Sequence, residues 1–84
     1  MISFENSAFA DYWQWSKEDK KIFDKINTLI TDILRDPFHG IGKPEPLKWN
    51  LSGYWSHRIT QEHRLVYKVF SEQIIIISCK YHYK

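Results

Sequence analysis

The sequence predicts an α+β fold with two N-terminal helices packed on a small, mainly antiparallel sheet, in the order β-α-α-β-β-β. Apolar residues recur with the period of a helix across residues 22–34, and three segments rich in β-branched and aromatic residues follow residue 53. A chain of 84 residues has room for one hydrophobic core, so we expect a single domain over residues 1–84.

The first element is expected to be a short strand at residues 2–4, which combine a β-branched and an aromatic side chain. A first helix should follow, because three aromatic side chains fall at the i, i+3, i+4 spacing of one helical face. These are Phe9, Tyr12 and Trp13. Trp15 falls off that stripe, and the pattern suggests no role for it.

A second helix is expected to start at Ser16, because Ser16 and Asp19 resemble a capping box. It should end at Asp36, since Pro37 disfavours helical geometry in the residue before it. The apolar residues within it follow the 3.6-residue period, which indicates a face buried against the sheet rather than a partner groove. They are Ile22, Phe23, Ile26, Leu29, Ile30, Ile33 and Leu34.

Residues 38–46 contain two glycines and two prolines, so we expect a loop with a restricted backbone. Three antiparallel strands should follow as a meander, at residues 54–59, 64–70 and 74–81. The last of these is apolar on both faces at its start, over residues 74–77. We therefore expect it to lie centrally in the sheet.

Composition points to a cytoplasmic protein that makes no membrane contact. The single cysteine, Cys79, excludes an internal disulfide and fits a reducing compartment. It lies in an apolar run and is expected to be a small buried side chain rather than a nucleophile. No apolar stretch approaches the roughly 20 residues needed to cross a bilayer, and no signal peptide is evident.

Positive charge is concentrated in the C-terminal half. The formal net charge is only +2. Residues 1–38 carry five Lys and Arg against seven Asp and Glu, whereas residues 39–84 carry seven against three, together with all four histidines. An anionic partner would be drawn to the C-terminal half, although an ordinary solvated surface would show the same imbalance.

A carboxylate, two arginines and a histidine near the C-terminus suit a site that handles a phosphodiester. Cleaving RNA without a metal requires a base for the ribose 2′-hydroxyl, positive charge for the phosphorane and an acid for the 5′-oxygen. Glu45, held between two prolines, is the candidate base, and His82 is the candidate acid. Arg64 and Arg58 are candidates to hold the phosphate through their fork-shaped donors.

Two further residues are expected to assist. Tyr83 could position the phosphate, and Lys48 adds positive charge. The residues themselves also allow a plainer interpretation, in which Glu45 is a loop carboxylate, Arg64 a solvated edge charge and His82 an exposed side chain. No metal or other cofactor is predicted, because the histidines lack the spacing and the cysteine or carboxylate companions of metal ligands.

Five segments resemble the YoeB/Txe toxins of the RelE-like mRNA interferase superfamily, and the likeness covers nearly the whole length of the chain. They are Gly-Lys-Pro-Glu-Pro-Leu-Lys at 42–48, Asn-Leu-Ser-Gly-Tyr-Trp-Ser at 50–56, Arg-Ile-Thr at 58–60, Glu-His-Arg-Leu-Val-Tyr at 62–67 and Tyr-His-Tyr at 81–83. The resemblance implies the RelE/YoeB-like microbial RNase fold. It also implies a toxin of a type II toxin–antitoxin system that cleaves mRNA in the A site of the 70S ribosome.

The same resemblance implies residue roles and partners. Glu45, Arg64, His82 and Tyr83 match the catalytic positions of the family, and the supporting positions are matched by Lys48, Arg58 and Glu62. The implied partners, besides mRNA and the ribosome, are a YefM-type antitoxin and a second copy of the chain in a homodimer.

Three residues depart from the family pattern. His57 stands where an arginine is usual, so one phosphate contact is expected to become pH-dependent. Trp49 replaces a polar residue or histidine and offers a stacking surface for an RNA base. Lys84 extends the chain by one residue, which affects the role of Tyr83.

Two other functions remain open. ParE-like toxins share the fold and inhibit gyrase through protein contacts, but they generally lack the glutamate, arginine and terminal histidine together. A non-catalytic module that binds RNA or the ribosome could use the basic strands with Trp49, Tyr54 and Trp55. Both alternatives predict that no new RNA ends appear.

Overall fold

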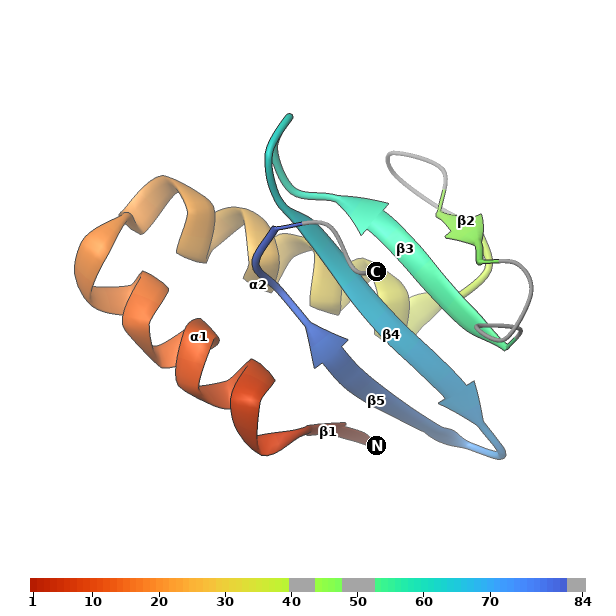
Figure 1. The fold of residues 1–84 in the computed structure, drawn as a ribbon. Coiled ribbons are helices and arrows are strands. Elements are labelled where there is room, and N and C mark those ends of the chain that lie inside the picture. Colours follow the sequence, from red (N-terminus) through yellow and green to blue (C-terminus); the bar gives the residue numbers. More distant parts are fainter. Residues whose placement is uncertain (40–43, 48–52, 82–84) are drawn as a thin grey trace.

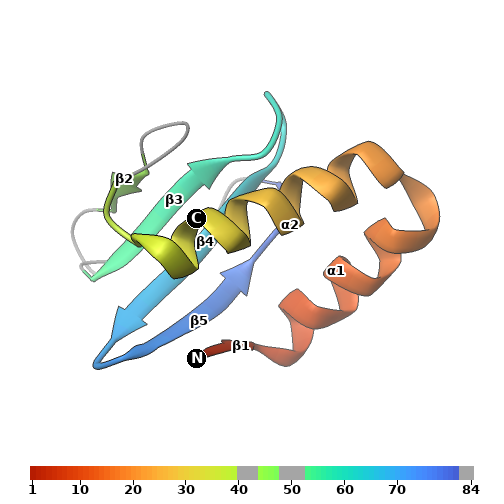
Figure 2. The same ribbon diagram turned by 180° about the vertical axis from the view of Figure 1, so that it is seen from behind.

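The computed structural model describes residues 1–39, 44–47 and 53–81 and confirms the predicted α+β architecture. In the five-stranded sheet, one face is covered by α2, which passes behind the strands in Figure 1 and in front of them in Figure 2, and α1 lies alongside β1 and β5. In chain order the elements are β1 (Ile2–Phe4), α1 (Asn6–Glu18), α2 (Lys20–Arg35), β2 (Glu45–Pro46), β3 (Tyr54–Arg58), β4 (Arg64–Phe70) and β5 (Gln73–Ser78).

The sheet is mixed, with strand order β1-β5-β4-β3-β2. The short β1 pairs parallel with β5, and every other pairing is antiparallel. The prediction that the last strand is internal is confirmed, because β5 is flanked by β1 and β4. The prediction that residues 38–46 form only a loop is wrong at its end, since Glu45 and Pro46 form the edge strand β2 against β3.

The start predicted for the second helix is also wrong. Ser16 lies inside α1, where its hydroxyl donates to the Trp13 carbonyl oxygen. Asp19 is the N-cap of α2, and its carboxylate accepts a hydrogen bond of 3.1 Å from the Ile22 amide. An aspartate carboxylate can accept from the unpaired amides of the first helical turn as well as a serine hydroxyl can. The start of α2 is therefore set by Asp19, whose side chain reaches these amides, and not by Ser16. The predicted end holds, because Asp36 is the C-cap.

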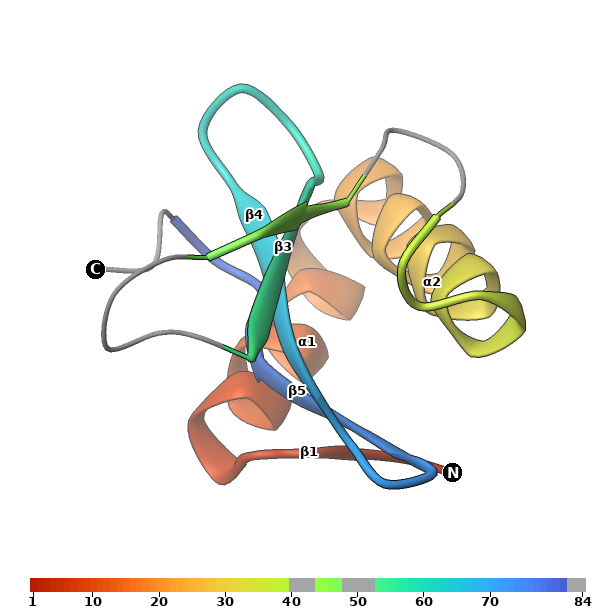
Figure 3. The same ribbon diagram turned by 90° about the vertical axis from the view of Figure 1, so that its right-hand side faces the viewer.

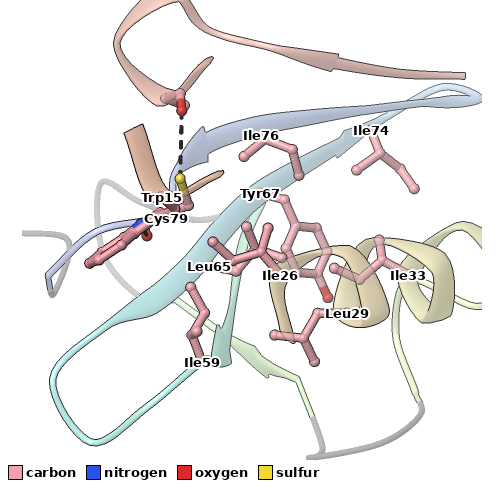
Figure 4. Close-up of a cluster of buried hydrophobic side chains, with 11 residues drawn as sticks. Trp15, Ile26, Leu29, Ile33, Ile59, Leu65, Tyr67, Ile74, Ile76 and Cys79 are labelled. Carbon is pink, nitrogen blue, oxygen red and sulfur yellow. Dashed lines mark hydrogen bonds between the residues drawn. The ribbon is translucent and has the colours of Figure 1, made fainter. Parts of the chain in front are cut away.

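The core lies between α2 and the inner face of the sheet (Figure 4). The apolar stripe of α2 is buried through Ile26, Leu29 and Ile33, which confirms the predicted packing face, although Leu34 remains 49% exposed. Strands β4 and β5 contribute the facing side chains. The most deeply buried of these are Leu65, Tyr67 and Ile76.

Trp15 and Cys79 join α1 to the end of β5. The indole of Trp15 is buried and donates a hydrogen bond of 3.0 Å to the Cys79 carbonyl oxygen. Cys79 is fully buried, as predicted, and burial raises the pKa of its thiol to about 12. The thiol therefore stays protonated at neutral pH and is not a nucleophile.

The phenol of Tyr67 ties the segment after α2 to the middle of the sheet. Its hydroxyl donates a hydrogen bond of 2.7 Å to the Pro37 carbonyl oxygen. Residues 37–39 leave the helix at this point, and the chain is next described at Pro44, one residue before β2 forms the sheet edge. No helix within the described residues is long and apolar enough to span a membrane.

Candidate active site

The strand register brings the predicted base and the predicted phosphate ligands to one face of the sheet. Glu45 pairs with Ser56, and Arg58 pairs with Arg64. Side chains of directly paired residues emerge on the same face, and those two positions apart along a strand do likewise. Since Leu65 points into the core, these four residues lie on the opposite face of the sheet from the core.

Ser56 orients the guanidinium group of Arg64. The Arg64 Nε donates a hydrogen bond to the Ser56 hydroxyl oxygen, and Ser56 is only 3% exposed. This bond uses one of the five N–H donors of the guanidinium, so its two terminal nitrogens can still bind a pair of phosphate oxygens. Arg64 is partly buried and Glu45 is exposed at the sheet edge, so a substrate can reach both.

An open pocket of about 630 Å³ joins these residues. The Pro44-Glu45-Pro46 segment forms one wall, and Arg58, Ile59 and Arg64 form another. Lys25 of α2 also lines it. Figure 3 shows β2 crossing in front of β3 and β4, with α2 beside them. The described lining residues include three cations and one carboxylate, an arrangement that attracts an anion and places it beside a base.

Sequence reasoning missed Lys25 and Ser56. Lys25 lies on the polar side of an amphipathic helix, and no spacing rule connects that position to a strand that comes some 20 residues later. Ser56 carried one signal, because it has the same strand parity as Arg58. That parity places the two residues on one face but does not indicate which side chain Ser56 contacts.

The structure separates other predicted residues from this face. His57 is 1% exposed and lies on the helix-covered side, with Trp55 and Ile59. It faces the core because it alternates with Ser56 and Arg58, so it has no place in the site proposed below. Glu62 is exposed in the β3–β4 connection, and its carboxylate lies 3.5 Å from the His63 Nε2.

Four predicted residues lie outside the described part of the chain. They are Lys48, Trp49, His82 and Tyr83. Within that part, no three His, Cys, Asp or Glu side chains form a group that could hold a metal ion. Among the described residues, the structure brings together one carboxylate and two guanidinium groups. A carboxylate can abstract a proton, and guanidinium groups can stabilise negative charge on a phosphate.

Comparison with known proteins identifies a family. A family model described as "YoeB-like toxin of bacterial type II toxin-antitoxin system" matches residues 4–83. Toxin YoeB of Escherichia coli (strain K12) is 55% identical over 82 residues, which are 98% of each chain. Toxin YoeB of Streptomyces coelicolor is 54% identical over the same length, again with 98% of each chain covered.

Solved structures agree over the full length. A YoeB/ParE toxin from Agrobacterium tumefaciens has a TM-score of 0.93 at 45% identity and covers 98% of both chains. A chain of the YoeB–YefM complex from Staphylococcus aureus has a TM-score of 0.90 at 52% identity, with 99% and 97% covered. A YoeB dimer from Staphylococcus aureus has a TM-score of 0.88 at 54% identity, with 98% and 95% covered.

Proposed function

The chain belongs to the YoeB-like toxins of bacterial type II toxin–antitoxin systems, and from this premise we propose that it is a ribosome-dependent endoribonuclease that cleaves mRNA. One observation carries the proposal. The register of β2, β3 and β4 places Glu45 beside Ser56, and Ser56 holds the guanidinium of Arg64 in the same pocket. A base and an oriented phosphate ligand therefore lie on one face.

The reaction needs only groups of the protein and the RNA itself. The Glu45 carboxylate removes the proton of the ribose 2′-hydroxyl, and the 2′-oxygen attacks the adjacent phosphorus. Arg64, assisted by Arg58, neutralises the charge that builds up on the phosphorane. His82 gives a proton to the departing 5′-oxygen. The products are a 2′,3′-cyclic phosphate and a 5′-hydroxyl, and DNA is spared because it lacks the nucleophile.

The open form of the pocket supports dependence on the ribosome. Glu45, Pro46 and Arg58 are all exposed, so the described residues form a shallow surface rather than a cleft that encloses an RNA strand. A surface of this kind cannot by itself supply the orientation that a phosphodiester needs for in-line attack. We infer that the ribosome fixes the mRNA and that this chain adds the catalytic groups.

The partners follow from relatives of known structure. One relative is solved in a YoeB–YefM complex and another as a YoeB dimer, both above 50% identity. We infer that this chain is likewise neutralised by a YefM-type antitoxin and forms a homodimer. An acidic or amphipathic antitoxin segment would complement the pocket, where Lys25, Arg58 and Arg64 outnumber the one carboxylate.

The test is to map 5′-hydroxyl RNA ends in a reconstituted translation reaction. We expect ends at A-site codons with the wild-type chain and few with Glu45→Gln or His82→Gln. Glu72→Gln is the matched control, because Glu72 is exposed in the β4–β5 turn, away from the pocket. Unaltered toxicity of Glu45→Gln in cells, without new RNA ends, would instead support inhibition of gyrase or binding without catalysis.

A further inference from the structure

The chain that leaves β5 is fixed at each residue by hydrogen bonds from other parts of the fold or from its own turn. We call residues 79–81 the exit segment. The Cys79 carbonyl accepts from the Trp15 indole at 3.0 Å, and the Lys80 carbonyl accepts from the Ser78 hydroxyl at 3.2 Å. At Tyr81 both backbone groups are bonded. Its N–H donates to His63 Nδ1 at 2.9 Å, and its carbonyl accepts from the Arg64 amide at 3.2 Å.

The His63 side chain is buried and contacts residues of α1, the exit segment and the β3–β4 connection. It is 6% exposed, and its ring meets the Trp15 ring edge-on with centroids 4.9 Å apart. The centroid of the Tyr81 ring, in the exit segment, lies 5.3 Å from that of the His63 ring. A backbone N–H can only donate, so Nδ1 must be an acceptor and the imidazole must carry its single proton on Nε2. That nitrogen lies 3.5 Å from the Glu62 carboxylate.

The exit segment also holds a conformation that a non-glycine residue rarely adopts. Tyr81 has φ of 57°, in the left-handed region. Residues in this region persist where surrounding contacts over-determine them. The two bonds at Tyr81, from a ring of the β3–β4 connection and from the first residue of β4, supply that constraint. The backbone is thus turned and held at the residue that directly precedes His82 in the sequence.

We propose that His63 is a positioning residue for the cleavage reaction. By accepting from the Tyr81 amide it holds the backbone of the residue that precedes His82, the proposed general acid, in the sequence. The Arg64 amide donates to the Tyr81 carbonyl, so the proposed phosphate ligand is also bonded to the residue that precedes His82. The inference rests on the proposed function for the role of His82.

A core histidine that only stabilises the fold would show the same burial, so the test needs a readout other than stability. His63→Leu removes the acceptor, and His63→Asn puts an amide oxygen near the place of Nδ1. Ile26→Val is the matched control for lost stability, because Ile26 is buried in the core and is not among the hydrogen-bond partners of the exit segment. Each variant is assayed at a temperature where circular dichroism shows it folded.

In the translation assay we expect His63→Leu to lower kcat about 10²-fold with KM within about twofold, because the acid is misplaced while mRNA presentation is unchanged. His63→Asn should recover most of that loss, and Ile26→Val should keep the wild-type kcat. In a His82→Gln background, His63→Leu should cost less than about threefold, since residues that act as a unit are not additive.

Long-range nitrogen–proton correlation of the wild-type His63 ring adds a readout independent of cleavage, and we expect an unprotonated Nδ1 and a protonated Nε2. If the wild type cleaves and His63→Leu keeps its kcat, the positioning role is overturned while the proposed function stands. Failure of His63→Asn to recover activity, or full additivity with His82→Gln, overturns it as well. A wild type that produces no ends overturns the proposed function, and the positioning role with it.

Discussion

The hydrogen bond between Arg64 and Ser56 leads us to expect different losses of activity when either residue is replaced by alanine. Arg64→Ala removes the guanidinium, whereas Ser56→Ala leaves it in place and removes only the hydroxyl that orients it. Ser56 is buried, and Arg64 is partly exposed. The two variants therefore separate the presence of the positive charge from its orientation.

The expected magnitudes differ by at least tenfold. Removing one preorganised donor from a transition state typically lowers kcat by about 10²–10³, and this is the loss we expect for Arg64→Ala. A hydrogen bond to a charged group contributes about 1.5–3 kcal/mol. The bond between Arg64 and Ser56 is present both in the ground state and in the transition state, so its full energy does not appear in kcat. Its loss acts only through orientation, so Ser56→Ala should cost about tenfold in kcat.

The assay counts 5′-hydroxyl ends per unit time at saturating programmed ribosomes. Ser3→Ala is the matched control, because Ser3 is exposed in β1, which is separated from β3 by two strands. Once Arg64 is alanine, adding Ser56→Ala should cost nothing further, because the hydroxyl then has no guanidinium to orient. Equal losses for the two single variants, or a full additional loss in the double variant, would refute the reasoning.

Three further predictions concern stability, titration and the pocket. Leu29→Ala should lower the free energy of unfolding by about 2–5 kcal/mol because Leu29 is fully buried, whereas Leu34→Ala at an exposed site should cost about 0.5 kcal/mol or less in the same urea titration. Burial raises the pKa of the Cys79 thiol from 9.0 to about 12. The free energy of unfolding should therefore fall as pH rises from 9 towards 12, because the unfolded chain loses a proton that the native chain keeps. A Cys79→Ala variant whose free energy of unfolding falls equally steeply with pH would refute this. Lys25→Ala should lower kcat/KM by about tenfold or less, and the loss should be smaller in high salt. The control is Lys20→Ala, which should match the wild type because the Lys20 ammonium pairs with Asp24. Equal losses of kcat/KM in the two variants would show that Lys25 is not part of the site.

Much of the fold and part of the site were accessible from the sequence because they depend on near neighbours. The burial of Ile26, Leu29 and Ile33 follows from a spacing that any helix would turn to one side. The limits of β4 follow from alternation between two turn segments, as its observed bounds confirm. The matching motifs named Glu45 and Arg64, and the structure brings both to one face.

Only the tertiary structure decided which residues meet. Glu45 becomes part of a strand because β3 offers it a partner, and Lys25 reaches the pocket because α2 packs beside the sheet edge. His57 turns to the core and Ser56 to Arg64, although both are polar residues of the same short strand. The period of apolar residues in a helix or strand depends only on residues close together in the sequence, so it can be recognised without the structure. Strand pairing joins segments far apart in the chain, and β3 carries polar side chains on both faces, so its local pattern does not show which face is buried.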